Sequence, residues 1–311
     1  TLSANQLATM SLVAMASYLT VGSIAVFVFA YNLQSVILSI VGISYSVAAF
    51  PTLVKLFANG HREEFLNQMV VTIKHMVFWL APAMVLFIVL RAQIVRVILG
   101  AGKFDWSDTR LTAATLAVFL LSAISQSLIL LFVRGYYACG RYLKPLLINV
   151  GSSLLIIVLA LIFSRLFVWW PEFKLNVAHF LRVTDVDGVE VLVLPLAFTI
   201  GSLLNLSIFW LSFKHDFGAF PRSLYRSLKQ SGISALVMGV TAYLVLQLLA
   251  PALDQSTFLG IFTQGAVAGL AGIGVGLLVL RWLGNEELKA IGHSLRHKFW
   301  RRAQPIMPVA E

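Results

Sequence analysis

The sequence predicts an all-α membrane protein, a polytopic bundle of about eight transmembrane helices. Hydrophobic residues make up 59% of its 311 residues and charged residues only 12%, whereas soluble domains carry about 25% charged residues. The acidic residues stand at the edges of long apolar runs or between them. Eight of these runs reach the length of about 20 residues that an α-helix needs to cross a bilayer.

The predicted spans follow one another with polar links between them. A tight link at residues 20–22 makes a helical hairpin of the first two spans, and Pro51 is expected to end the second. Lys74 in the first turns of the third span is expected to snorkel toward the interface, and Pro82 to kink that span. The eight spans are residues 3–20, 22–50, 68–90, 111–133, 145–164, 191–213, 231–250 and 258–281.

Two sizeable loops separate the spans on one side, at residues 91–110 and 165–190. The first contains a short apolar turn at residues 94–99, and acidic or hydroxyl side chains after it are candidates to cap the next helix. The C-terminal tail has apolar residues at helical spacing among basic ones, which predicts either an interfacial helix or a frayed basic end. The candidate caps are Asp105, Asp108 and Ser107.

The distribution of basic residues predicts the orientation. Of the 23 Lys and Arg, Lys74 lies within a span, fifteen fall in the loops and tail of one side, and seven fall on the other side. Cytoplasmic loops carry the excess of Lys and Arg, so both termini are expected in the cytoplasm. The net charge of +10 then indicates anionic membrane lipids as partners rather than nucleic acid.

The sequence contains no recognisable catalytic or metal-binding constellation, so we expect neither an enzyme nor a cofactor. The phosphate-cradling and zinc-protease motifs are absent, and the histidines are scattered except for His293 and His297 on the basic tail. The single Cys139 has no partner for a disulfide or a metal site. The chain starts at Thr1 without a basic leader, which we interpret as the continuation of a longer protein.

Polar side chains inside the predicted spans are the candidate site, because such groups tend to face the bundle interior or a water-filled cavity. Asn32 and Gln34 are two positions apart, so their amides leave a helix in different directions. One neighbouring helix could hardly bond both, whereas a polar cavity could. Serines and threonines are expected to make interhelical hydrogen bonds instead. The candidate cavity residues are Tyr31, Asn32, Gln34, Gln126 and Asn149.

Two further groups are expected to border the cavity. Arg134, Arg141 and Lys144 follow the fourth span on the more basic side and predict a basic cytoplasmic rim, with simple anchoring as the alternative for Arg134. Small residues at spacings of three and four in the last span let a helix or a lipid tail approach its backbone closely. They are Gly265, Gly269, Gly272 and Gly276.

Several segments, taken in order, resemble the lipid II flippase family, MurJ/MviN, of the multidrug/oligosaccharidyl-lipid/polysaccharide exporter superfamily. They are ASYLTVGSIAVFVFAYNLQ, followed by a helix ending in AAFPTLVKLFA, then LGAGKFDWSDTRLTA and VRGYYACGRYLKP. The resemblance covers about residues 5–150 and beyond them rests on the number and spacing of spans. It implies two six-helix lobes and a final helix pair. Residues 1–215 would be the second lobe, residues 216–284 the terminal pair and residues 285–311 a cytoplasmic tail, with the N-terminal lobe missing.

The resemblance also implies a function in the bacterial cytoplasmic membrane. Its members move a polyprenyl-linked glycan lipid, the undecaprenyl-pyrophosphate-linked peptidoglycan precursor lipid II, by alternating access. The headgroup occupies the cavity between the lobes, and the lipid tail lies in a groove near the last two helices. Well-studied members carry an Arg where this sequence has Asn32, and some carry a sodium-binding acid near Leu12, where it has none. The first difference favours an alternative, export of another lipid-linked oligosaccharide or a drug; a non-transporting cell-wall assembly scaffold is a third hypothesis.

Overall fold

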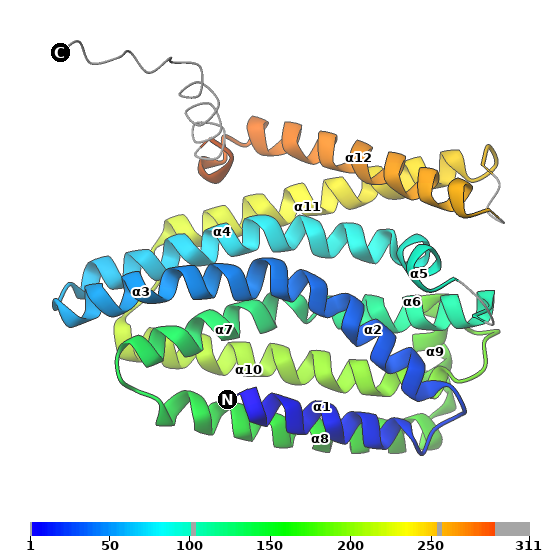
Figure 1. Cartoon of the computed structure of the whole chain (residues 1–311), viewed down its shortest axis with the longest axis horizontal. Coiled ribbons are helices and arrows are strands. Elements are labelled where there is room, and N and C mark those ends of the chain that lie inside the picture. The colour runs from blue at the N-terminus through cyan, green and yellow to red at the C-terminus, as the bar shows by residue number, and fades with distance from the viewer. Residues whose placement is uncertain (1, 101–103, 254–256, 290–311) are drawn as a thin grey trace, which may run out of the picture.

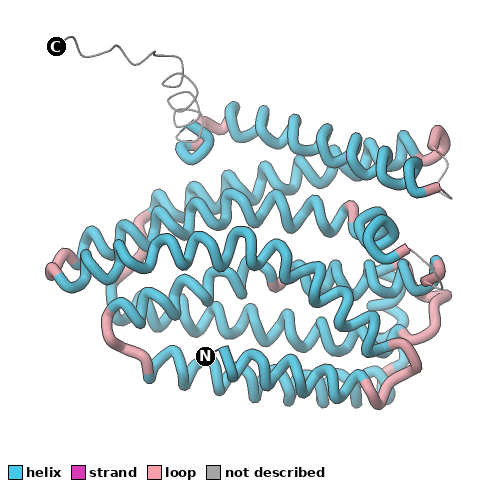
Figure 2. Tube along the Cα trace, viewed as in Figure 1, coloured by secondary structure: helices cyan, strands magenta, loops and turns pink. Residues whose placement is uncertain are grey.

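The computed structural model describes residues 2–100, 104–253 and 257–289, and every regular element in these ranges is helical (Figures 1 and 2). The prediction of an all-α bundle is confirmed. In chain order the elements are α1 (Leu2–Ala16), α2 (Ser23–Ile37), the π-helix η1 (Leu38–Ile43), α3 (Ser44–Ala58), α4 (Arg62–Val89), α5 (Arg91–Leu99), α6 (Trp106–Leu120), α7 (Ala123–Ala138), α8 (Leu143–Trp169), α9 (Pro171–Leu181), the short 3₁₀-helix η2 (Val189–Leu192), α10 (Val193–Phe217), α11 (Arg222–Leu249) and α12 (Phe258–Trp282).

Seven helical stretches in the described residues are long and apolar enough to cross a membrane. They match the second to eighth predicted spans, and the predicted first span corresponds to the shorter helix α1, which ends at Ala16. Two stretches combine several elements: Ser23–Ala58 joins α2, η1 and α3, and Trp106–Ala138 joins α6 and α7. The prediction of a membrane bundle is therefore confirmed, with α1 shorter than its apolar run.

The prediction that Pro51 ends the second span was wrong. The helix continues through Pro51 to Ala58, which places the proline in the middle of α3. A proline removes one hydrogen bond of the helical ladder, but membrane helices tolerate this where neighbouring segments adjust. The preceding π-helix η1, which ends at Ile43, already departs from regular α geometry.

Both predicted loops between spans contain helices. The apolar turn expected at residues 94–99 is part of α5, and the loop at residues 165–190 contains the end of α8 and all of α9. The expected cap before the fourth span is Asp105, whose carboxylate accepts a hydrogen bond from the Asp108 backbone at 2.8 Å. The tail predicted as an interfacial helix lies outside the described residues beyond Lys289.

The long helices lie side by side with their ends at two opposite faces of the bundle (Figure 1). α10 packs against α8 and α7, α2 against α6, and α3 against α4 and α7; α11 packs on α4 and on α12. An aromatic core joins three of them: the Phe213 ring of α10 lies 5.2 Å from that of Phe132, 5.7 Å from that of Tyr136 and 6.3 Å from that of Phe65. The face made by α1, α2, η1 and α3 is turned to the viewer and lies in front of α8, α6 and α7.

Candidate functional site

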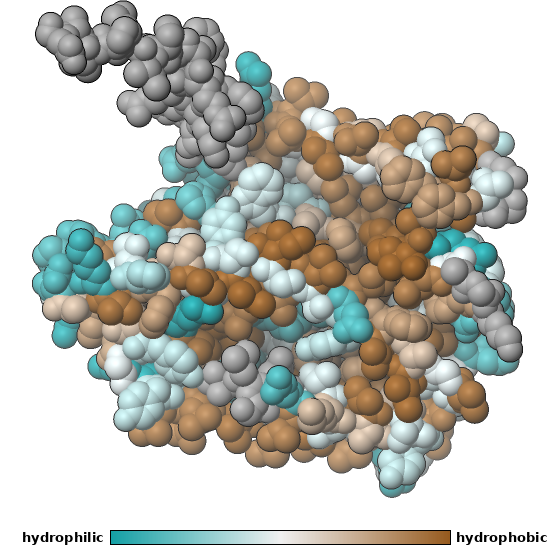
Figure 3. Space-filling view, in the orientation of Figure 1, coloured by the Kyte–Doolittle hydropathy of each residue, from teal (hydrophilic) through white to brown (hydrophobic). Residues whose placement is uncertain are grey.

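The helical stretch Ser23–Ala58 is largely exposed, because only 28% of its most apolar part is buried against the rest of the structure. A row of polar side chains lies on its exposed surface. Asn32, Ser39 and Ser44 are exposed, and Ser35 between them is partly exposed. We call these four residues the polar stripe. In the view of Figure 3, pale and teal residues lie among brown ones on the face to which this helix belongs.

The π-helix η1 keeps the polar stripe in one line. Ser35 Oγ donates to the Asn32 carbonyl at 2.7 Å and Ser39 Oγ to the Ser35 carbonyl at 2.8 Å, which are α-helical spacings. Ser44 Oγ lies 3.3 Å from the Ser39 carbonyl, five residues back. In a regular α-helix, the residue five positions after Ser39 would face a different side of the helix. A π-helix instead brings positions i and i+5 onto the same side. The serine hydroxyl protons are thus used within the helix, which leaves their oxygens as acceptors.

Close packing accompanies the π-helix. A Cβ atom at Gly42 would lie 2.6 Å from Ser127 Oγ on α7, so only glycine lets the backbone of η1 come this near. Single π-helical turns inside α-helices are frequent at functional sites. The position of the polar stripe therefore depends on contacts between η1 and α7.

Of the predicted cavity residues, Asn32 is exposed, and no hydrogen bond to its amide is found among the described residues. Gln34 lies on the opposite side of the helix and is 0% exposed, and neither of its amide atoms has a hydrogen-bond partner in the described residues. The prediction that the two amides point in different directions is confirmed. Tyr31 packs in an aromatic cluster with Phe119 at 5.7 Å and Phe198 at 6.0 Å.

Gln126 and Asn149 make hydrogen bonds inside the bundle. Gln126 Nε2 donates to Ser122 Oγ at 2.8 Å, beside the break between α6 and α7. Asn205 Nδ2 on α10 donates to Asn149 Oδ1 on α8 at 3.1 Å. These contacts are interhelical or local packing contacts. Substrate binding by the five candidate residues stays a prediction, for which Asn32 has the most suitable position.

The residues of the predicted basic rim meet an acid that sequence reasoning missed. The side chain of Asp216, at the end of α10, is 10% exposed and accepts hydrogen bonds from Lys144 and, at 2.9 Å, from Tyr136. Arg141 lies 3.7 Å from the same carboxylate. Arg134 is partly exposed on α7. A lone acid at the end of a span facing two basic loops was the signal that could have identified Asp216.

The space beside the glycines of α12 is filled by neighbouring helices. A Cβ atom at Gly265 would touch Gln93 of α5 and one at Gly269 would touch Leu90, both at 3.3 Å, while Cβ atoms at Gly272 and Gly276 would meet Met238 of α11. Close helix packing, one of the two uses predicted for these small residues, therefore accounts for the contacts seen. Their role in holding a lipid tail stays a prediction.

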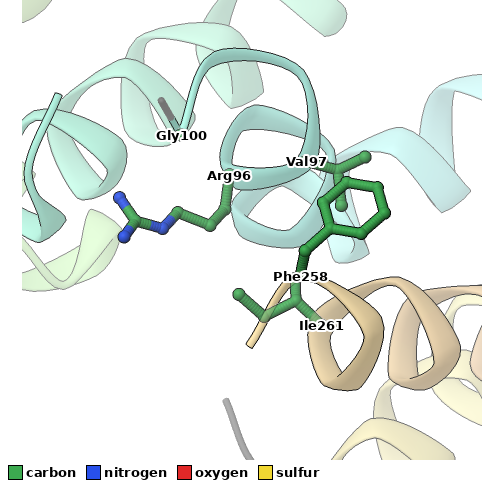
Figure 4. Close-up of a pocket in the computed structure, with 5 residues that line it drawn as sticks. All are labelled: Arg96, Val97, Gly100, Phe258 and Ile261. Atoms are coloured by element: carbon green, nitrogen blue, oxygen red, sulfur yellow. The ribbon is translucent and has the colours of Figure 1, made fainter. Parts of the chain in front are cut away.

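A small cavity of about 70 Å³ opens where α5 meets the start of α12 (Figure 4). Val97 and Arg96 of α5 and Phe258 and Ile261 of α12 line it. The Arg96 side chain extends away from Phe258 in this view, and its Nη1 donates to the Phe104 carbonyl at 3.0 Å. The cavity is thus a small gap of mixed lining, and its one cation is already bonded to a backbone carbonyl.

Comparisons with known proteins agree with this fold. The family model described as Lipid II flippase MurJ matches residues 1–263. Two relatives are named "Probable lipid II flippase MurJ": one from Rhizobium tropici is 28% identical over 149 residues, 46% of this chain and 28% of the relative, and one from Bdellovibrio bacteriovorus is 31% identical over 147 residues, 47% and 26% respectively.

Two solved structures share the fold. One, described as lipid II flippase MurJ in an inward closed conformation, has a TM-score of 0.67 and 20% identity over 90% of this chain and 52% of that chain. The other, an outward-facing multidrug resistance MATE family transporter of the MOP superfamily, has a TM-score of 0.53 and 15% identity over 92% and 63% respectively. The chain thus spans about half the length of the solved flippase. Its matches to the two curated relatives cover little more than a quarter of the length of each relative.

Proposed function

This chain belongs to the lipid II flippase MurJ family, and from that premise we propose that it forms part of a flippase for a polyprenyl-pyrophosphate-linked peptidoglycan precursor. The flippase moves the precursor across the bacterial cytoplasmic membrane by alternating access, without covalent chemistry. In this proposal the chain supplies a lobe and the terminal helix pair, and a further N-terminal lobe supplies the opposite wall of the cavity. Both termini of the chain lie on the cytoplasmic side.

The polar stripe is the observation that carries the proposal. A glycan and peptide headgroup presents many hydroxyl and amide donors, and the serine oxygens of the stripe are free to accept from them. The Asn32 amide adds one group that both donates and accepts. An exposed row of polar side chains within a membrane span costs free energy when it faces the lipid. It is accommodated if it faces water and a polar headgroup.

Loss of the Asn32 amide tests the proposal. The full-length gene is expressed in a strain depleted of its own lipid II flippase, as wild type, Asn32→Leu and the control Val36→Leu, which changes an exposed apolar position one turn away. We expect rescue by wild type and Val36→Leu and a loss of at least about tenfold in precursor translocation for Asn32→Leu, the effect of about one lost hydrogen bond to a polar group.

Three results would contradict parts of the proposal. Failure of well-expressed wild type both to rescue growth and to translocate the precursor would reject the substrate and favour another lipid-linked oligosaccharide or a drug, which competition assays then identify. Full activity of Asn32→Leu with wild-type rescue would keep the function but remove the stripe as the headgroup contact. A scaffold without transport predicts rescue of growth by wild type with no precursor translocation in reconstituted vesicles.

A further inference from the structure

A pocket of about 410 Å³ lies away from the polar stripe, where the first turns of α11 meet the segment that follows α12. Figure 1 shows the start of α11 and the end of α12 at the same end of the bundle. The pocket combines two guanidinium groups with two carboxylates. The residues that matter for its chemistry are Arg222, Arg226, Ser227, Gln230, Glu286 and Glu287.

Hydrogen bonds hold the wall of this pocket in place. Gln230 Nε2 donates to the Leu283 carbonyl at 3.0 Å, and Asn285 Nδ2 donates back to Gln230 Oε1 at 3.2 Å. Ser227 Oγ donates to Glu287 Oε1 at 2.9 Å. The chain after α12 is therefore fastened to α11 along the pocket, which makes the pocket a built feature and not a gap between two loose ends.

Glu287 is the feature that points to a ligand. It lines the pocket, is only 5% exposed, and its second carboxylate oxygen, Oε2, has no hydrogen-bond donor among the described residues. Among the described residues the nearest cation is Lys74 of α4, which forms loose salt bridges with both acids: its Nζ lies 4.0 Å from Glu287 Oε1 and 3.8 Å from Glu286 Oε2, both beyond hydrogen-bond distance. A buried carboxylate without a full set of donors is costly. A cationic donor that enters the pocket and displaces the atoms covering the buried Oε2 would remove this cost.

The opposite wall attracts an anion. Arg222 and Arg226 are one turn apart on α11 and both exposed, so their guanidinium groups are available. Guanidinium groups bind phosphate oxygens in a bidentate manner. A ligand that suits both walls carries a phosphate and, a few bonds away, an amine that can donate hydrogen bonds.

Aromatic residues place the pocket at the membrane surface. Tyr225 lies between the two arginines in sequence and is 49% exposed, and Trp282 at the end of α12 is 86% exposed. Exposed Tyr and Trp at the ends of spanning helices are typical of the interface where lipid headgroups lie. A phosphate-bearing ligand at this level is a phospholipid.

We propose that this pocket binds the headgroup of an aminophospholipid, with the phosphate on Arg222 and Arg226 and the primary ammonium on Glu287. The bound lipid fastens the terminal helix pair to the membrane surface and bridges α11 to the segment after α12. The site is independent of the substrate that the flippase moves.

Lipid retention by the purified full-length protein tests the proposal. The protein is exchanged into nanodiscs that contain equal parts of phosphatidylethanolamine, phosphatidylcholine and phosphatidylglycerol, extracted, and examined by native mass spectrometry. We expect preferential retention of phosphatidylethanolamine, because the quaternary amine of phosphatidylcholine cannot donate hydrogen bonds and phosphatidylglycerol brings no cation to Glu287. The double variant Arg222→Ala/Arg226→Ala should retain about tenfold less of it.

Two variants complete the design. Lys229→Ala, which removes an exposed cation of α11 that does not line the pocket, should retain phosphatidylethanolamine as wild type does. Glu287→Gln should lose the preference over phosphatidylcholine while still binding both lipids. Equal retention of the three lipids by wild type would overturn the proposal, as would a preference for phosphatidylglycerol or equal losses in the arginine and Lys229 variants. Unchanged melting temperatures show that the variants are folded.

Discussion

The Tyr136 hydroxyl donates a hydrogen bond to Asp216 at 2.9 Å and so connects the end of α7 to the end of α10. Lys144 donates to the same carboxylate, and the Lys144 ammonium lies 5.7 Å from the centre of the Tyr136 ring. One nearly buried acid thus holds the ends of α7 and α10 and the start of α8 together, next to the residues predicted as a basic rim.

Removing this acid should weaken the bundle. For Asp216→Ala we expect a loss of about 2 kcal/mol of stability, because a hydrogen bond to a charged group contributes about 1.5–3 kcal/mol and its donors would be left without a partner. Thermal unfolding of the detergent-solubilised protein measures the change. Asp187→Ala, which removes an exposed acid in the loop before η2, is the control and should change stability by less than about 0.5 kcal/mol. Equal melting temperatures for both variants would show that the Asp216 contacts contribute nothing.

Gln34→Leu should leave stability unchanged or raise it by about 1 kcal/mol. Both amide atoms of Gln34 are buried without a partner among the described residues, and such an unsatisfied group costs about 1–3 kcal/mol, whereas an apolar side chain of similar size does not. The same melting experiment applies, with Gln126→Leu as the comparison because it removes an existing bond to Ser122. A loss of more than about 1 kcal/mol in Gln34→Leu would instead indicate a polar partner such as ordered water.

The polar stripe shows where sequence reasoning reached its limit. Hydropathy located the spanning helices, since the length of an apolar run is a local property, and it singled out Asn32 and Gln34 correctly as polar groups on different sides. It could not align Ser44 with Ser39, because the π-helix between them packs through Gly42 closely on Ser127, a residue of another helix far along the chain, and such a contact is not visible in the local sequence. Which polar residues find interhelical partners depends on the same kind of distant contact.

Asn149 illustrates this second point. Its amide in a predicted span was compatible with a wet cavity, and its partner Asn205 lies 56 positions away on another helix. The pairing requires α8 and α10 to lie side by side in one register, which neither span specifies alone. Asp216 was missed for a related reason. An acid at the end of a span is expected to be exposed to solvent, and its contacts with Lys144 and Tyr136 become visible only in the folded structure.

The terminal helix pair offers a graded test of helix packing. A methyl group at Gly272 would lie 2.9 Å from the Met238 backbone carbonyl, whereas one at Gly276 would meet the flexible end of the Met238 side chain. Gly272→Ala should therefore cost about 1–3 kcal/mol and Gly276→Ala less, because only the side chain can move aside. Gly274→Ala faces open space and should be neutral or stabilising by up to about 1 kcal/mol. Melting temperatures in another order would contradict the observed contact between α11 and α12.

Cys139, the chain's single cysteine, should react slowly with alkylating reagents at neutral pH. Burial raises the pKa of its thiol to about 11, an effect that Arg141 and Arg62 only partly oppose, so the reactive thiolate is scarce near neutral pH. We expect the rate of maleimide labelling to increase about tenfold per pH unit up to about pH 10. At about pH 7.5 the rate should be at least about tenfold lower than that of an ordinary exposed thiol with a pKa of about 8.5. Tyr142→Cys in a Cys139→Ser background provides that thiol at an exposed position three residues away, and its rate should level off near about pH 9. A plateau for Cys139 below about pH 9 would mean that the loop between α7 and α8 opens enough to hydrate the thiol, and that the Asp216 contacts beside it are correspondingly loose.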